Sequence, residues 1–76
     1  MKKYKFIEIR QEDGEMFDGH PVYRIVNNKS DTELGMLCYY KTWRQYIFRA
    51  EDETCVFNIS CMHDIIDFME NHAGKA

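Results

Sequence analysis

The residues of this chain that could do chemistry gather around Cys61, with Ser60 before it and His63 just after it. Cys61 is expected in the first turn of a helix, where the positive end of the helix dipole lowers the pKa of a thiol. A thiol-dependent activity at Cys61 is therefore one hypothesis for the function. Most free cysteines are buried packing residues, however, and we interpret Cys61 in that way.

Two other groups of residues have the atom types of a functional site but lack its spacing. Ser60, His63 and Asp64 suggest a catalytic triad, yet a helix cap followed by a solvated helix face explains them more simply. A zinc site needs ligands at recognised spacings, and no Cys-x-x-Cys knuckle is present. Its candidate ligands would be Cys55, Cys61, His63 and His72. We therefore predict no catalytic residue, no metal and no cofactor.

The densest signal for binding is a run of aromatic and basic residues in the middle of the chain. Protein-binding surfaces concentrate aromatic rings and arginine, so this run is our candidate partner-binding surface. The same rings could instead fill the core of a small domain. The candidate residues are Tyr39, Arg44, Tyr46 and Phe48 on one face of a hairpin, with Tyr40 and Trp43 on the reverse.

Single-stranded nucleic acid is an alternative ligand for this hairpin, because rings next to arginine form stacking platforms for bases. Tyr39, Arg44, Tyr46 and Arg49 would form such a platform. Phosphate neutralisation supplies most non-specific affinity, and here the acidic residues 51–53 follow Arg49 directly. A protein partner is therefore the favoured hypothesis.

Composition limits the class of protein. The 76 residues are 45% hydrophobic and carry a net charge of −3, which indicates one folded domain over residues 1–76 with no global attraction to nucleic acid or anionic membrane. So short a chain has little room for a substrate cleft, so we expect a protein that is not an enzyme. Three cysteines without a pairing motif favour the cytoplasm, and no apolar stretch is long enough to cross a membrane.

Alternation of apolar and polar residues predicts five strands at residues 4–10, 21–27, 32–40, 43–49 and 54–59. Gln11 to His20 is expected to be the longest loop, because it is polar and rich in turn residues. The short link Lys41-Thr42 predicts a two-residue hairpin turn, which would place Tyr39 opposite Arg44.

The C-terminal segment predicts a helix near residues 61–72. Ser60 is the expected N-cap, and Met62, Ile65, Ile66 and Met69 repeat at helical spacing. Gly74 is expected to end the helix, with residues 75–76 fraying.

Trp-Arg-Gln-Tyr-x-Phe at residues 43–48 and Cys-x-x-Asp-Ile-x-x-Phe at residues 61–68 resemble a family of small bacterial and phage proteins of unknown function. The likeness covers about the C-terminal half of the chain. It implies a bacterial or phage origin and transfers no activity.

Together these patterns predict an α+β fold, in which an antiparallel meander of about five strands carries one C-terminal helix on one face. One helix covers only one face, so we expect the other face to stay open for a partner. The expected function is a non-enzymatic interaction module, such as a phage or mobile-element accessory acting on a host protein. The partner would be another protein or a second copy of the chain.

Overall fold

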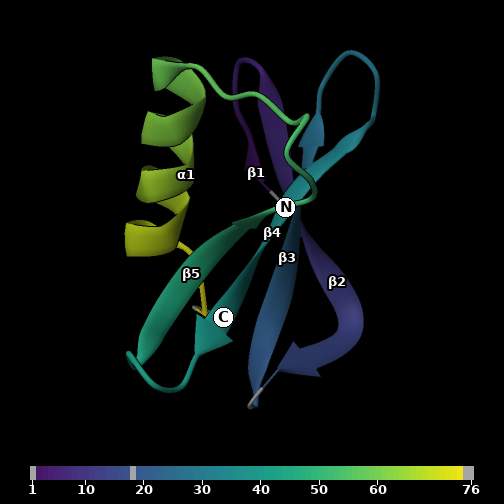
Figure 1. Cartoon of the computed structure of the whole chain (residues 1–76). Coiled ribbons are helices and arrows are strands. Elements are labelled where there is room, and N and C mark those ends of the chain that lie inside the picture. The colour runs from purple at the N-terminus through teal and green to yellow at the C-terminus, as the bar shows by residue number, and fades with distance from the viewer. Residues whose placement is uncertain (1, 18, 75–76) are drawn as a thin grey trace.

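The structure is a computed structural model that describes residues 2–17 and 19–74. Within these residues, five strands form one antiparallel sheet in the order β1-β2-β3-β4-β5, followed by one helix (Figure 1). The predicted α+β meander with a C-terminal helix is therefore confirmed. No helix in this part of the chain has the length and apolar composition needed to cross a membrane. The elements are β1 Lys2–Lys3, β2 Ile7–Phe17, β3 His20–Asn27, β4 Glu33–Tyr40, β5 Gln45–Ala50 and α1 Ile59–Asn71.

The N-terminal strand differs from the prediction at both ends. Residues 4–6 turn between β1 and β2, and the Asn28 side chain holds this turn by donating to the carbonyl oxygens of Tyr4 at 2.7 Å and Lys5 at 3.2 Å. The predicted loop after Arg10 is wrong, because β2 runs on to Phe17. Its polar, glycine-containing residues form an irregularity in the β2–β3 register rather than a loop.

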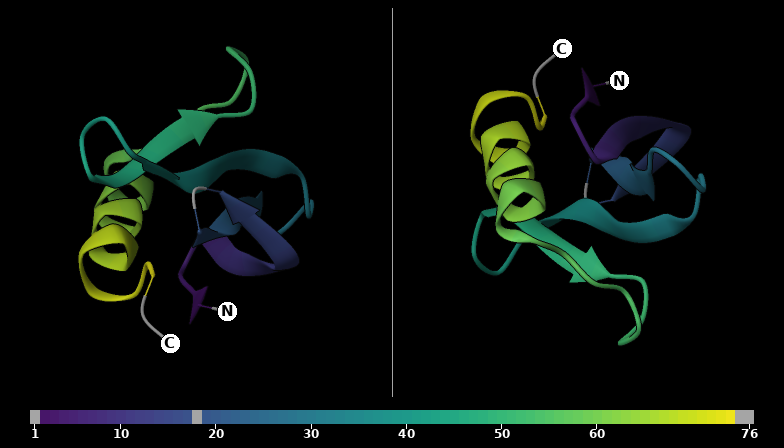
Figure 2. Two further views of the ribbon diagram at one scale, coloured as in Figure 1. Left: turned by 90° about the horizontal axis from the view of Figure 1, so that it is seen from below. Right: turned by 90° about the horizontal axis from the view of Figure 1, so that it is seen from above.

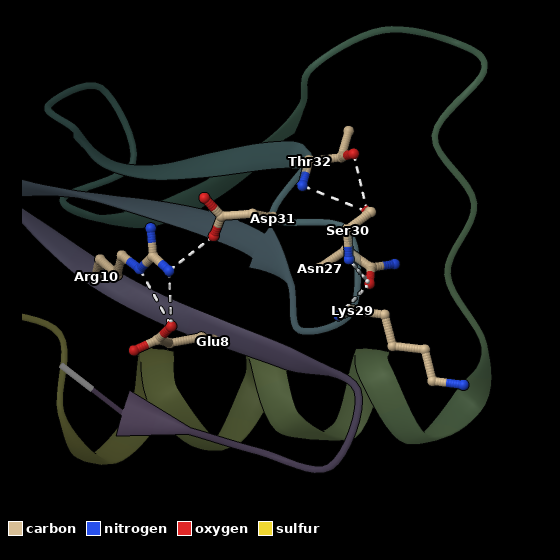
Figure 3. Close-up of polar contacts among 7 residues, drawn as sticks. All are labelled: Glu8, Arg10, Asn27, Lys29, Ser30, Asp31 and Thr32. Carbon is tan, nitrogen blue, oxygen red and sulfur yellow. Dashed lines mark hydrogen bonds and ion pairs between the residues drawn. The ribbon is translucent and has the colours of Figure 1, made fainter.

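The β3–β4 hairpin forms as predicted, to within one residue at each strand boundary that meets the turn. Its turn is closed by Asn27, whose side-chain oxygen accepts from the backbone N–H groups of Lys29 at 2.8 Å and Ser30 at 3.3 Å (Figure 3). Asparagine stabilises turns through such local bonds to the backbone.

The β4–β5 hairpin has a longer turn than predicted. Four residues, from Lys41 to Arg44, separate the strands, and Tyr39 lies opposite Tyr46 rather than Arg44. The observed register is shifted by two residues from the prediction. Because side chains alternate with a period of two, a shift of two leaves every strand residue on its predicted face.

The predicted fifth strand at residues 54–59 is wrong. The chain turns at Asp52, whose side chain accepts from the Thr54 N–H at 2.8 Å, and then leaves the sheet without pairing (Figure 1). The helix begins at Ile59, with Asn58 as the N-cap in place of Ser60. It ends at Asn71, close to the predicted position, and the predicted fraying of residues 75–76 falls outside the described residues.

The hydrophobic core lies between α1 and one face of the sheet (Figure 2). The Tyr23 ring meets the Phe68 ring edge-to-face at 4.9 Å, and the Tyr23 hydroxyl accepts from the Gly74 N–H at 2.9 Å. These contacts attach both the helix and the residues after it to β3. The buried core residues are Ile7, Ile9, Tyr23, Ile25 and Leu37 from the sheet, with Cys61, Ile65, Phe68 and Ala73 from the C-terminal segment.

The other face of the sheet is covered by its own charged side chains. Arg10 donates to Glu8 at 3.0 Å and to Asp31 at 2.8 Å (Figure 3). Arg24 donates to Glu12 at 3.0 Å and to Glu33 at 3.3 Å. Val22, Val26 and Cys38, which alternate with the core residues and so belong to this face, are buried. The expectation of an open face is therefore wrong for β2–β4, since these apolar residues are buried on a face that also carries the ion pairs of Arg10 and Arg24.

Candidate partner-binding site

The six predicted surface residues do not form one continuous surface. Tyr40 and Trp43 are exposed and meet edge-to-face at 5.0 Å near the β4–β5 turn, with Trp43 64% exposed. Arg44 is exposed in the turn itself. Tyr39, Tyr46 and Phe48 alternate on the helix side of the sheet and are only partly exposed. That any of them binds a partner stays a prediction.

Two of these rings are engaged in contacts within the chain. The Tyr39 ring stacks on His20 with 3.8 Å between ring centres. The Tyr46 hydroxyl donates to the Pro21 carbonyl at 2.7 Å, and burial raises the pKa of Tyr46 to about 12. Each ring thus has one side or one polar group in contact with β3.

An open pocket of about 510 Å³ lies beside the β4–β5 turn. The Tyr39–His20 stack forms one part of its lining, and the side chains of Lys41 and Arg44 form the other. Two cations next to a ring pair suit an anionic ligand with a planar group.

A second hollow runs between β5 and α1, and we call it the β5–α1 groove. One part holds about 260 Å³ and is lined by Phe48, Phe57, Met62, Ile65, Ile66 and Met69. The adjoining part holds about 220 Å³, shares Ile66 and Met69, and continues to Gln45 and Tyr46. The first part is lined by apolar side chains alone. The groove therefore offers an apolar trough along β5.

The exposed flank of α1 next to this groove is also apolar. Cys61, Ile65 and Phe68 are buried, whereas Ile59, Met62 and Ile66 are 70%, 48% and 52% exposed. At 100° per residue, the exposed three form a second row beside the buried one. The predicted stripe mixed members of both rows, because the width of an apolar stripe does not reveal how much of it is covered.

The opposite flank of α1 is polar and already has a partner. Asp67 accepts a hydrogen bond from the Tyr4 hydroxyl at 2.8 Å, and this bond holds the pKa of Asp67 below its ordinary value. The helix is thus hydrogen-bonded next to β1, whereas on the β5 side its apolar side chains line the groove together with Phe48 and Phe57.

The two edge strands of the sheet also differ: the β1 edge is charged and the β5 edge is apolar. β1 consists of two exposed lysines, a composition that discourages pairing with another chain. β5 is the other edge strand, with six residues of which Tyr46, Ile47 and Phe48 are large and apolar. An edge strand presents unpaired backbone N–H and C=O groups, so β5 is a template for a further strand.

The residues considered for chemistry are not brought together. Cys61 is only 6% exposed, and it lines an open pocket of about 400 Å³ together with Val56 and Phe57. A thiol-dependent activity at Cys61 stays a prediction. Within residues 2–17 and 19–74, no group of three histidine, cysteine or acidic side chains could hold a metal ion.

Comparison of the chain with models of known families, with curated proteins and with solved structures finds no match.

Proposed function

We propose that this protein is a non-enzymatic interaction module that binds an extended polypeptide strand by adding it to the edge of β5. The partner strand would supply backbone hydrogen bonds to β5 and apolar side chains at alternate positions to the β5–α1 groove. This mode of recognition combines main-chain affinity with side-chain pockets. The observation that carries the proposal is the apolar groove beside β5, the strand at one end of the described sheet.

The direction of the backbone groups supports the proposal. The Glu51 N–H donates to the Leu34 carbonyl at 2.8 Å, in register with the β4–β5 pairs. Antiparallel bonding alternates along a strand, so the backbone groups of Arg49, Ile47 and Gln45 are expected to face β4. Those of Tyr46, Phe48 and Ala50 then face outward. These three residues would bond the added strand.

Selection of short random peptides displayed against the immobilised full chain tests the proposal. We expect enriched peptides with apolar residues at alternate positions, and we expect them to slow amide hydrogen exchange at Tyr46, Phe48 and Ala50. Ile66→Lys should weaken their binding by about tenfold, because it places a charge in the apolar groove.

Met16→Lys is the matched control, since Met16 in β2 is 56% exposed and Ile66 is 52% exposed. It should leave peptide affinity within about twofold of the original protein. Selection of no peptide, or of peptides that bind the Ile66→Lys protein equally well, would overturn the proposal.

A second candidate function is binding of single-stranded nucleic acid at the pocket beside the β4–β5 turn. The pocket supports it because Lys41 and Arg44 could contact phosphate while the Tyr39–His20 stack contacts a base. Titration with a labelled single-stranded oligonucleotide at low salt tests it. Binding should weaken steeply with added salt and in Lys41→Ala/Arg44→Ala. Failure to bind at low salt removes this candidate.

A further inference from the structure

We propose that the strand added to β5 is β5 of a second copy of this chain, so that two copies join their sheets in an antiparallel, two-fold symmetric dimer. The inference rests on the proposed function, because it names the partner of the same edge. Symmetric pairing of identical surfaces is the commonest route to a homodimer.

The outward backbone groups select one register. Antiparallel pairing between two copies bonds outward residues to outward residues, which here are Tyr46, Phe48 and Ala50. A register centred on Phe48 places Phe48 opposite its equivalent and Tyr46 opposite Ala50 of the other copy. Any other register that places outward residues opposite one another leaves at least one of Tyr46, Phe48 and Ala50 without a partner among these three residues. The register centred on Phe48 therefore gives the most bonds.

The charges at the two ends of β5 support antiparallel pairing with itself. Its N-terminal end follows the basic turn residues Lys41 and Arg44, and its C-terminal end leads into the acidic residues Glu51, Asp52 and Glu53. In the proposed register, Gln45, which follows the basic turn, comes level with Glu51 of the other copy. The basic β4–β5 turn of each copy thus lies beside the acidic residues 51–53 of the other copy, and the dimer contains two such contacts. A parallel arrangement would place like charges together.

The helices fit the same symmetry. The two-fold axis of such a pair runs perpendicular to the joined sheet. Both α1 helices therefore lie on the same face of the joined sheet. The exposed apolar residues Met62 and Ile66 of each helix lie on the β5 side of its own domain. In the dimer these residues come together over the paired strands. A standard interface buries about 800 Å² per partner, which is about a seventh of the 5405 Å² surface of this chain.

Sedimentation velocity of the full chain over a wide range of concentrations tests the inference first. We expect a mass of twice 9.2 kDa at high concentration, with dissociation on dilution. Ile66→Lys should favour the monomer, and Met16→Lys should behave as the original protein does.

Charge reversal then tests the orientation. Lys41→Glu/Arg44→Glu makes the turn acidic, and Glu51→Lys/Glu53→Lys makes the link basic. Each variant alone should dimerise about tenfold more weakly, because two attractive contacts become repulsive. Mixing the two variants should restore a dimer, since a mixed pair has opposite charges at both contacts. Lys29→Glu, in the β3–β4 turn, is the matched control and should change nothing.

The outcomes separate the two proposals. A chain that is monomeric at every concentration, yet still selects peptides in an Ile66-dependent way, overturns the dimer and leaves strand addition intact, with a different protein as the partner. A dimer that neither charge variant weakens overturns the proposed β5 register. A monomer that selects no peptide overturns both proposals. Far-ultraviolet circular dichroism of each variant identifies any loss of fold, and restoration by mixing excludes misfolding as the cause of weakened dimerisation.

Discussion

Gly35 is the residue at which β4 and β5 leave the least room. A methyl group built on Gly35 would lie 2.5 Å from the Arg49 carbonyl oxygen and 2.9 Å from Cε1 of Phe48. In the strand register, Phe48 lies opposite Leu37, and Gly35 lies opposite Ala50. The contact between the Phe48 ring and Gly35 is therefore diagonal. The ring can move, but the backbone oxygen of a paired strand cannot move without breaking the sheet. We therefore expect any larger residue at Gly35 to destabilise the sheet.

Gly35→Ala should lower the free energy of unfolding by about 3 kcal/mol, because the added carbon clashes with backbone. Urea denaturation followed by circular dichroism measures this. Gly14→Ala is the comparison, since Gly14 has a φ of 74° and nothing within 4 Å of the added carbon. It should cost only about 1 kcal/mol of left-handed strain. Equal losses in the two variants would show that steric clash at Gly35 is not the cause.

The Tyr4–Asp67 hydrogen bond should make stability depend on acid pH. The bond lowers the pKa of Asp67, so the folded state favours the carboxylate. This contribution is present above the ordinary pKa of 3.8 and is lost as pH falls through the lower folded value. Tyr4→Phe removes the bond and should reduce the loss of stability between about pH 5 and about pH 2. Urea midpoints across this range measure the effect, and an unchanged acid dependence would contradict it.

At the scale of the element, the start of α1 depends on Asn58 rather than on Ser60. The Asn58 side-chain oxygen accepts from the Cys61 N–H at 2.7 Å, which satisfies one of the unpaired groups at the helix start. Both residues are good N-caps by type, and the sequence alone favours Ser60 because it borders the helical spacing. The chain reaches the helix from the turn at Asp52, and that path decides which residue has the capping conformation.

Asn58→Ala should lower the free energy of unfolding by about 1 kcal/mol, as expected for loss of an N-cap. Ser60→Ala should change it by no more than a few tenths of a kcal/mol, since Ser60 lies exposed inside the helix. Thermal and urea unfolding of both variants measure the difference. A larger loss in Ser60→Ala than in Asn58→Ala would contradict this assignment.

At the scale of the whole molecule, the charged side chains on the second sheet face include Glu33. Glu33 makes stability depend on pH in the direction opposite to that of Asp67. Burial and a hydrogen bond with Glu51 raise the pKa of Glu33, and the nearby Arg24 guanidinium opposes the increase. Because the folded pKa is raised, this contribution to stability falls as pH rises from the ordinary value of 4.5 through the folded value. Arg24 limits that loss.

Arg24→Met should raise the pKa of Glu33 further and cost about 1 kcal/mol more at neutral pH than near pH 4. Nuclear magnetic resonance titration of the Glu33 carboxyl group measures the pKa, and urea midpoints measure the stability. Arg10→Met is the control, because Arg10 pairs with Glu8 and Asp31 instead. An unchanged Glu33 pKa in Arg24→Met would show that Arg24 does not moderate this carboxyl group.

Residue periodicity predicts the class of fold and most of the helices and strands. Alternation predicted β3 and β4 closely, and it placed Tyr46 and Phe48 on the same face as Tyr39. Helical spacing predicted α1 to within two residues at its start and one at its end. These features follow from the sequence because strand and helix periods are local properties of the backbone.

Strand pairing, the buried side of the helix and the ion pairs depend on residues far apart in the chain, so local periodicity does not predict them. Residues 54–59 have strand-forming side chains, yet within the described part of the chain they pair with no strand, because the chain turns at Asp52 and the Phe57 ring packs on Phe48 of β5 instead. Which apolar row of α1 is buried depends on where the helix crosses the sheet, so the exposed row with Ile66 lay unrecognised within one predicted stripe. Arg10 and Arg24 cover the second face only because folding brings Asp31, Glu12 and Glu33 to them. Contacts between segments far apart in the chain set these outcomes, and no local pattern records them.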